Sequence, residues 1–285
     1  MNAQVVDEIV RRAVAEDVGP GDLTTEACVP AGARGEAVLL VKAPGVLCGH
    51  PVARAVFALL DPAVRYEELV PEGASVAAGT VAARLSGPAR ALLSGERVAL
   101  NFLQRLSGIA TATRVMAERI AHTQAHLIDT RKTTPGLRYL EKYAVRVGGG
   151  FNHRYALFDG VLIKDNHIVV AGGIRQAVAA CRRAVPHTCR VEVEVETLAQ
   201  LDEALDAGAE VIMLDNMSIP LMAEAVQRTA GRALLEASGG IDQNTLQAVA
   251  ETGVDLISSG ALTHSVKALD ISMDITVSVP VGAGQ

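Results

Sequence analysis

Short apolar runs alternate with longer segments of helical periodicity through the second half of the chain. The apolar runs lie at 126–129, 161–163, 190–195, 210–214, 233–236 and 255–257, and helix patterns lie at 172–185, 197–208, 218–230 and 242–252. Repeated β/α units predict parallel strands joined by right-handed crossovers. Six clear strands in about 150 residues are few for a full eight-unit barrel. We therefore favour a reduced α/β barrel of six to seven strands over an open doubly wound sheet.

The first 110 residues mix strand and helix patterns. Residues 34–48 indicate a strand pair around Pro44-Gly45, and residues 71–85 indicate short strands around turns. Residues 88–122 are mostly helical in pattern, and Ser107-Gly108 predicts a break between two helices. We expect a domain boundary near residues 107–112 and an extended tail after residue 268.

Composition agrees with α/β architecture and excludes several classes of protein. Hydrophobic residues make up 49% and aromatic residues 3% of the 285 residues, a balance that suits buried parallel strands under Ala-containing helices. No apolar run approaches the roughly 18 residues of a membrane span, and the N-terminus lacks the pattern of a signal peptide. A net charge of -6 without a long basic face argues against nucleic acid as a partner. The four cysteines form no CxxC pair, so we expect reduced thiols in a cytoplasmic protein.

Positive charge is concentrated between residues 131 and 164. This stretch holds seven Lys/Arg and two acids, a sum of +5 inside a chain of net charge -6. It also contains Pro135-Gly136 and Gly148-Gly149-Gly150, which position backbone rather than fill a core. A local cationic focus in an acidic protein suits a small molecule with several negative charges. Three of the cations, Arg138, Lys142 and Arg146, lie at helical spacing, and we expect them on a partly solvated helix face.

Polar residues follow every predicted strand, at the ends where β/α barrels carry their chemistry. Basic residues follow the first two strands, acids the next two, and serine-glycine turns the last two; in order these are Arg131, Lys132, Lys164, Glu194, Glu196, Asp215, Ser238-Gly239-Gly240 and Ser258-Ser259-Gly260. Glycine-rich loops after the final strands fit a barrel phosphate site. Acids facing cations suit Mg²⁺ held between phosphate oxygens.

Each of these residues also has a purely structural interpretation. Glu194 and Asp215 are candidates for helix caps, and His153 and His167 are candidates for satisfied core histidines. Glu192 and Glu194 belong to an alternating run of acids that places their side chains on one face of a strand. Acids on one face of a buried strand destabilise the fold unless they are paired or bind metal. That argument favours a functional role for at least one of them.

The chain resembles the quinolinate phosphoribosyltransferase family, also called nicotinate-nucleotide pyrophosphorylase (carboxylating). The likeness covers nearly the whole length and includes EDVGPGDLTT at 16–25, ERVALNFLQRLSGIAT at 96–111, DTRKTTPGLR at 129–138, VGGGFNHR at 147–154, LIKDNH at 162–167, EVEVE at 192–196, MLDN at 213–216, EASGGI at 236–241 and GALTHS at 260–265. The resemblance implies an N-terminal α/β sandwich at 1–110, a reduced barrel carrying the active site at 111–268 and a tail at 269–285 that returns to the first domain. It also implies a homodimer.

The same resemblance implies an activity and a set of site residues. The activity is Mg²⁺-dependent transfer of phosphoribosyl from phosphoribosyl pyrophosphate to quinolinate with loss of CO₂, giving nicotinate mononucleotide and pyrophosphate for de novo NAD biosynthesis. The implied quinolinate pocket consists of Arg131, His153, Arg154 and Lys164, with Arg97 supplied by the partner subunit. The implied catalytic residues are Lys132, Lys164, Glu194 and Asp215, of which Glu194 and Asp215 would also face the metal. The implied 5′-phosphate site consists of Ser238, Gly239, Gly240 and Gly260.

Three competing functions remain open from the residues alone. An aldolase-like barrel would use Lys164 as a Schiff-base lysine, although it leaves the arginines and the two phosphate-type loops unexplained. A non-catalytic anion-binding protein on the same fold would bind ligand without turnover. The paralogue associated with molybdenum transport shares much of the scaffold, and the complete Arg/Lys/His set here argues against it.

Overall fold

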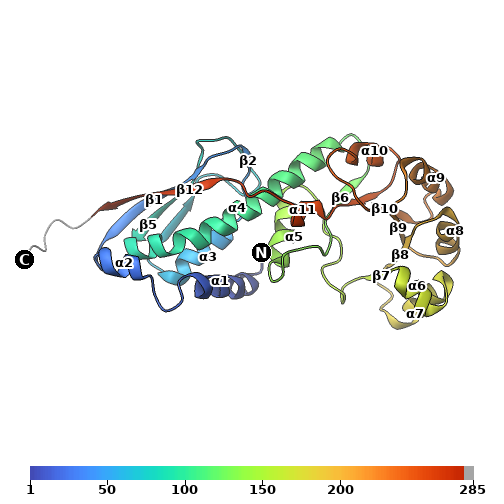
Figure 1. The fold of residues 1–285 in the computed structure, drawn as a ribbon, viewed down its shortest axis with the longest axis horizontal. Helices are drawn as coiled ribbons and strands as arrows, with labels where there is room; N and C mark the ends of the chain where they lie inside the picture. The colour runs from blue at the N-terminus through green and yellow to red at the C-terminus, as the bar shows by residue number, and fades with distance from the viewer. Residues whose placement is uncertain (279–285) are drawn as a thin grey trace, which may run out of the picture. The chain divides into compact units, whose positions relative to one another are not determined.

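The computed structural model describes residues 1–278, which divide into two compact units (Figure 1). The first unit contains Met1–Ala112, Thr134–Gly148 and the chain from Val266 on, and the second contains Thr113–Thr133 and Gly149–Ser265. Residues 134–148 were expected in the barrel, and that boundary was wrong. The reason is helix α5 (Arg138–Val147), whose fully buried Glu141 forms an ion pair with Arg105 at 2.5 Å within the first unit.

The first unit is built on a four-stranded antiparallel sheet of order β12-β1-β5-β3. The strands are β1 (Arg34–Val41), β3 (Arg65–Glu68), β5 (Val81–Pro88) and β12 (Ile271–Ser278), and the helices are α1 (Ala3–Asp17), α2 (Leu23–Cys28), α3 (His50–Leu60), α5 and part of α4 (Ala89–Arg119). Strand β1 alternates exposed and buried positions, which places Ala37, Leu39 and Val41 in the core. The rest of the predicted tail, residues 279–285, lies outside the described residues.

The strand pair predicted at 34–48 does not form. Strand β1 is hydrogen-bonded on both edges, to β12 on one side and β5 on the other. A strand that leaves β1 at Pro44 therefore finds no free edge, and the short β2 (Gly45–Val46) pairs instead with β4 (Ser75–Val76). Both partners of β1 are distant in the sequence, β5 at Val81–Pro88 and β12 at Ile271–Ser278, and local turn signals do not report such pairings.

The break predicted at Ser107-Gly108 is also wrong, because α4 runs unbroken over 31 residues. Both residues serve close packing. The Ser107 hydroxyl accepts a hydrogen bond from the Cys48 N–H at 2.9 Å and donates to the Cys48 carbonyl at 3.1 Å. Gly108 packs against the chain at Lys267, where a Cβ would overlap the Lys267 carbonyl and lie 3.1 Å from the Ala268 Cα.

We expect Gly108→Ala to lower the free energy of unfolding by about 1–3 kcal/mol, the usual penalty for overpacking, despite the better helix propensity of alanine. Denaturant unfolding of the purified protein measures this. Gly32→Ala is the matched control, because nothing lies within 4 Å of a Cβ built there. An unchanged denaturant midpoint for Gly108→Ala would show that the backbone at Lys267 moves freely.

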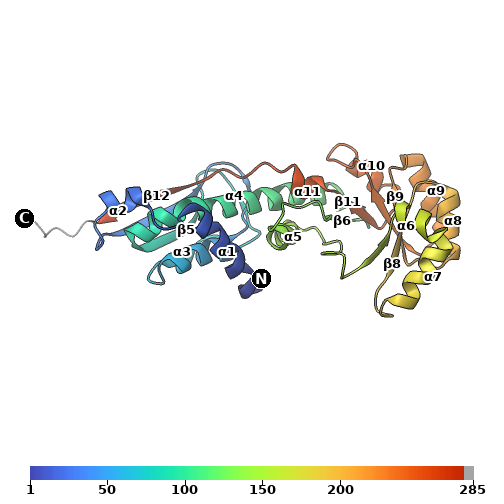
Figure 2. The same ribbon diagram turned by 60° about the horizontal axis from the view of Figure 1, so that its bottom comes forward.

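The second unit is a six-stranded, fully parallel sheet of order β6-β11-β10-β9-β8-β7. The strands are β6 (His126–Ile128), β7 (Val161–Ile163), β8 (Val191–Val195), β9 (Val211–Asp215), β10 (Leu234–Ser238) and β11 (Leu256–Ser258), and the helices are α6 (Asp165–Ala171), α7 (Ile174–Ala184), α8 (Leu198–Asp206), α9 (Ile219–Thr229), α10 (Leu246–Ala250) and α11 (Ala261–His264). Figure 2 shows helices α7 to α10 along the outside of the curved sheet. This architecture confirms the predicted reduced barrel beside an α/β first domain.

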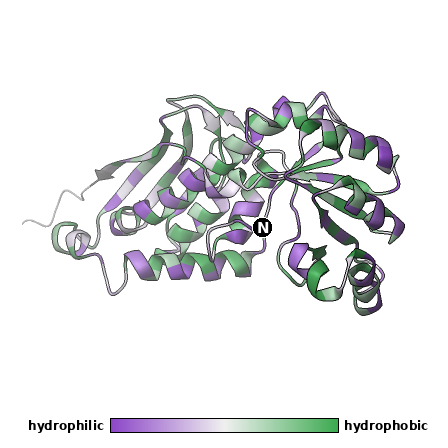
Figure 3. Ribbon diagram, turned by 45° about the vertical axis from the view of Figure 1, so that its right-hand side comes forward, coloured by the Kyte–Doolittle hydropathy of each residue, from purple (hydrophilic) through white to green (hydrophobic). Residues whose placement is uncertain are grey.

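Hydrophobic residues in the second unit concentrate on the strands, as Figure 3 shows. Val191, Val193 and Val195 of β8 are buried, which is typical of a parallel strand covered on both faces. Thr197 caps α8, with its side chain accepting from the Gln200 N–H. Asp242 caps the turn before α10 rather than the helix itself, whose N-cap is Thr245.

Lys142 was expected on a solvated helix face and is instead 3% exposed on α5. All four cysteines are free, in agreement with the absence of a paired pattern. No helix within residues 1–278 has both the length and the apolar character needed to cross a membrane.

Candidate active site

A cavity of about 800 Å³ lies in the second unit at the C-terminal ends of the parallel strands. Every strand of the sheet contributes to its lining, through residues of the strand itself or through the loop that follows. The predicted site residues found there are Arg131, Lys132, His153, Arg154, Lys164, Glu194, Asp215, Ser238, Gly239, Gly240 and Gly260. Arg97 is the exception: it is exposed on α4 in the first unit and does not line this cavity in the described chain.

Two arginines, Arg131 and Arg154, line the cavity. Arg154 donates from Nη1 to the Gly160 carbonyl at 2.9 Å, which fixes the side chain. Burial, and then the neighbouring Arg131 guanidinium, lower the pKa of Arg154. Two like charges held together in a partly buried place favour binding of an anion, which relieves both the repulsion and the loss of hydration.

Lys164 ends β7 and faces an acid from the next strand. Its Nζ lies 2.7 Å from Oε2 of Glu194 on β8. The Lys164 backbone N–H donates to Nδ1 of His167 at 2.9 Å, so His167 is part of the start of α6 rather than a core histidine. The ion pair places Lys164 among charged groups, unlike the apolar surroundings that activate a Schiff-base lysine.

Asp129 holds the turn that carries His153, a role that the sequence analysis did not assign. Its fully buried carboxylate follows β6 and accepts from Asn152 Nδ2 at 2.7 Å and from the His153 N–H at 2.8 Å. The loop that holds Arg131 and the turn that holds His153 are therefore fixed to the same side chain. The available signal was an acid placed directly after an apolar run.

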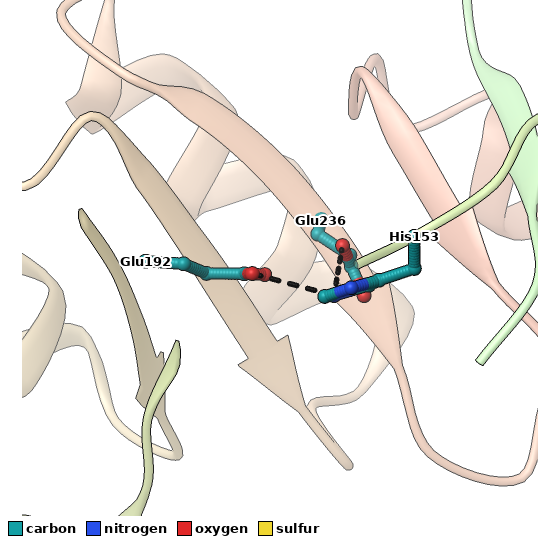
Figure 4. A group of neighbouring side chains, drawn as sticks. All are labelled: His153, Glu192 and Glu236. Atoms are coloured by element: carbon teal, nitrogen blue, oxygen red, sulfur yellow. Dashed lines mark ion pairs between the residues drawn. The ribbon is translucent and has the colours of Figure 1, made fainter. Parts of the chain in front are cut away.

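His153 lines the cavity. Its ring contacts Glu192 and Glu236 of the barrel strands, as Figure 4 shows. Its Nε2 is 3.3 Å from Oε2 of Glu192 on β8 and 3.6 Å from Oε2 of Glu236 on β10. The Arg154 N–H donates to His153 Nδ1 at 2.6 Å, so the ring carries its proton on Nε2. Both nitrogens have protein partners, which agrees with the satisfied-histidine interpretation even though the ring also lines the cavity.

Glu236 is a second residue that the sequence analysis missed. It is 1% exposed in the middle of β10, and burial, followed by the charge of Glu192, raises its pKa to about 8. The signal was an acid inside an apolar strand, LLEAS at 234–238, where only its position next to the glycine turn was noted. Glu192 had been recognised as an acid that needs a partner, and the structure supplies His153.

Two glycine-containing turns also line the cavity. Gly239 has φ +96°, and a Cβ there would overlap the Asn216 side chain, so glycine is required after Ser238. At Gly260 a Cβ would lie 2.8 Å from Lys132 Cδ and 2.9 Å from His264 Nε2. Gly260 therefore permits the close approach of Lys132 and His264 to its backbone, and His264 is a third cavity residue without a role in the sequence analysis.

The basic residues, acids and serine-glycine turns that line this cavity define a barrel protein whose site suits a ligand with several anionic groups. Sequence comparison identifies it further. The model of "Quinolinate phosphoribosyl transferase, C-terminal domain" matches residues 109–274, and that of the N-terminal domain matches residues 22–107. The chain therefore belongs to the quinolinate phosphoribosyl transferase family.

Individual relatives agree over nearly the full length. The chain is 48% identical over 278 residues to the probable nicotinate-nucleotide pyrophosphorylase [carboxylating] of Bacillus subtilis, covering 98% of this chain and 96% of that protein. A relative with the same name from Synechocystis is 46% identical, covering 95% and 92%. The crystal structure of NadC from Streptococcus pyogenes superimposes with a TM-score of 0.94 at 42% identity, covering 98% and 99%. The predicted family, fold class and enzyme class, a phosphoribosyltransferase, are confirmed.

Proposed function

We propose that this protein transfers phosphoribosyl from phosphoribosyl pyrophosphate to quinolinate with loss of CO₂, forming nicotinate mononucleotide and pyrophosphate. The observation that carries the proposal is that one cavity brings together basic residues, acids and two glycine turns. This inventory matches two anionic substrates that must react within one site.

Quinolinate is a dianion, and the two arginines of the cavity suit it. Arg131 and Arg154 can each hold a carboxylate through two parallel N–H donors. His153 lines the same cavity, and its ring is fixed by Glu192 and by the Arg154 N–H. The pyridine nitrogen is then held toward the ribose, so that much of the catalysis is positioning of the two reactants.

The cavity acids Glu194 and Asp215, together with Lys132, suit the ribose and the leaving pyrophosphate. Departure of pyrophosphate leaves positive oxocarbenium character on the sugar, which a nearby carboxylate such as Glu194 or Asp215 stabilises. Lys132 and Lys164 offset the negative charge of the leaving group. The N–H groups of the turns at Ser238-Gly239-Gly240 and Gly260 hold the 5′-phosphate.

The carboxylates present would fit a Mg²⁺ ion bound to the pyrophosphate group of phosphoribosyl pyrophosphate. Mg²⁺ keeps most of its waters and typically takes one or two protein carboxylates along with substrate phosphates. Asp215 lines the cavity, whereas Glu194 is already bonded to Lys164 and would reach a metal only by giving up that contact. We assign Asp215 as the protein carboxylate that would hold the ion, which would neutralise charge on the leaving group.

A homodimer completes the proposed site. Leu157, Phe158, Val169 and Val170 are 71–88% exposed in the stretch between and after the cavity residues Arg154 and Lys164. Apolar side chains grouped next to a site mark a surface that another protein covers. In this proposal the partner subunit covers that surface and contributes Arg97, and the enzyme is cytoplasmic, in keeping with its four free cysteines.

An assay with quinolinate, phosphoribosyl pyrophosphate and Mg²⁺ tests the function by following CO₂ and mononucleotide. We expect one CO₂ per mononucleotide, little product from nicotinic acid, and loss of activity when a chelator removes Mg²⁺. Nicotinic acid lacks the second carboxylate, so its preferred use would overturn the substrate assignment and keep the transfer chemistry. Binding of quinolinate without any product would favour the anion-binding alternative.

A further inference from the structure

Glu192 and Glu236, the two acids that contact His153, have no role in the reaction as described so far. Glu192 is 7% exposed and Glu236 is 1% exposed, and they come from strands β8 and β10 of the barrel interior. One carboxylate oxygen of each and a His153 ring nitrogen all lie within 4.8 Å of one another. Within residues 1–278, Oε1 of Glu192 and Oε1 of Glu236 have no hydrogen-bond partner.

Glu192 and Glu236 cannot both be ionised in these buried positions. Neutral His153 offers a single N–H to two buried carboxylates, and a buried charge without a partner destabilises the fold by several kcal/mol. Two carboxyl groups in such a site keep one proton between them. The deeper group keeps it, because burial and the charge of Glu192 both raise the pKa of Glu236. Glu236 is therefore a neutral carboxylic acid, and it lines the cavity whereas Glu192 does not.

The proposed reaction needs one proton inside this cavity. When CO₂ leaves the ribosylated ring, its bonding electron pair stays on carbon 2 of the pyridine, stabilised by the adjacent cationic nitrogen. That carbon must gain a proton before nicotinate mononucleotide can be released. Arginine and lysine line the cavity as charge partners, and His153 in its neutral form has its only N–H directed at the acids. Protonated Glu236 is therefore the proton donor next to His153.

We propose that Glu236 is the catalytic acid that protonates carbon 2 after decarboxylation, an inference that rests on the proposed function. The C2–carboxylate bond breaks and CO₂ departs without the electron pair. The O–H bond of Glu236 then breaks, and its proton forms the new C2–H bond with that pair. Glu236 is left as a carboxylate beside Glu192, with no other reactant consumed.

The same contacts favour reprotonation of Glu236 after the reaction. Two adjacent ionised carboxylates repel each other, so the pair regains its proton from water after product leaves. Glu236 itself lines the cavity, so its proton can be replaced from there. The groups that face Glu236 are His153 from the turn after residue 150, Glu192 from β8 and Ser258 from β11.

Glu236→Gln tests the proposal, because glutamine keeps the shape and cannot transfer a proton. In single-turnover experiments we expect pyrophosphate release within about threefold of wild type and mononucleotide formation slowed about 100-fold or more. The ribosylated, still carboxylated intermediate should accumulate, and the KM for quinolinate should change little. In the wild type, the decarboxylation phase alone should slow as pH rises through about 8, the pKa of Glu236.

Two further variants keep the test decisive. Glu224→Gln, a half-exposed partner of Arg228 on α9, is the matched control and should behave as wild type. Glu192→Gln removes the neighbouring charge, so the slowing of decarboxylation should move to lower pH. Should Glu236→Gln fail to fold, the wild-type and Glu192→Gln pH profiles decide by themselves.

Three results would overturn the proposal. These are mononucleotide formation by Glu236→Gln at the wild-type rate, a pH dependence confined to pyrophosphate release, and a metal ion bound stoichiometrically by His153, Glu192 and Glu236 in elemental analysis. Absence of any transfer by the wild type would instead refute the proposed function, so the two failures are distinguishable.

Discussion

Lys164→Ala should lower kcat by about three orders of magnitude, which is the scale for removing a preorganised charge from a site of this kind. The lysine ends β7 and extends into the cavity, where its Nζ meets Glu194. In the proposed reaction it faces substrate anions whose charge moves to the leaving group. Alanine removes that charge and leaves the Glu194 carboxylate to repel both substrates.

The fold should tolerate this change. The Lys164 side chain is 46% exposed, and exposed ion pairs contribute little to stability. Thermal unfolding of Lys164→Ala should therefore resemble that of the wild type while turnover is lost. Lys42→Ala, at an exposed position in the first unit, controls for the loss of a lysine as such. Near-normal turnover of folded Lys164→Ala would remove this residue from the catalytic set.

Lys164→Arg separates charge from geometry in the same assay. Arginine keeps the positive charge but replaces a compact ammonium with a planar fork. Partial activity would indicate that charge alone is sufficient, and activity as low as that of alanine would indicate that the contact with Glu194 sets the position of the charge.

The barrel half of the fold was predictable because its pattern is local. Each βα unit contains a buried apolar strand and a helix of clear periodicity, so the strand ends follow directly from the sequence. In a parallel barrel those ends meet on one side, and this rule placed Lys164, Glu194 and Asp215 in one cavity before their distances were known. The same reasoning found the serine-glycine turns.

The remaining features depend on contacts between distant parts of the chain. Gly108 looked like a helix breaker, because nothing near it in the sequence reveals that the backbone at Lys267 packs against it. Glu236 was hidden inside an apolar strand, since its effect depends on Glu192 of another strand. Arg97 lies on the first unit, and only family resemblance pointed to it as part of a site. Local patterns therefore predict where chemistry sits, and tertiary contacts decide how each group behaves.

A mixture of two inactive variants should recover activity if Arg97 acts across a dimer interface. Arg97→Ala and Lys164→Ala chains are each expected to be inactive alone. After subunit exchange, a hybrid dimer contains one site that lacks both residues and one site that lacks neither. With random exchange of equal amounts, about a quarter of the wild-type activity should return, because half of the dimers carry one intact site of two.

The control for this experiment is a mixture of variants from the same side of the interface. Lys164→Ala mixed with Arg131→Ala should stay inactive, because both residues line the cavity of one chain and every hybrid site lacks one of them. Exchange must be verified with differently tagged chains. Recovery in the first mixture alone requires Arg97 to come from the neighbouring subunit, since no single chain in it is complete. No recovery despite verified exchange would confine Arg97 to its own chain and leave the cavity of the second unit as the whole site.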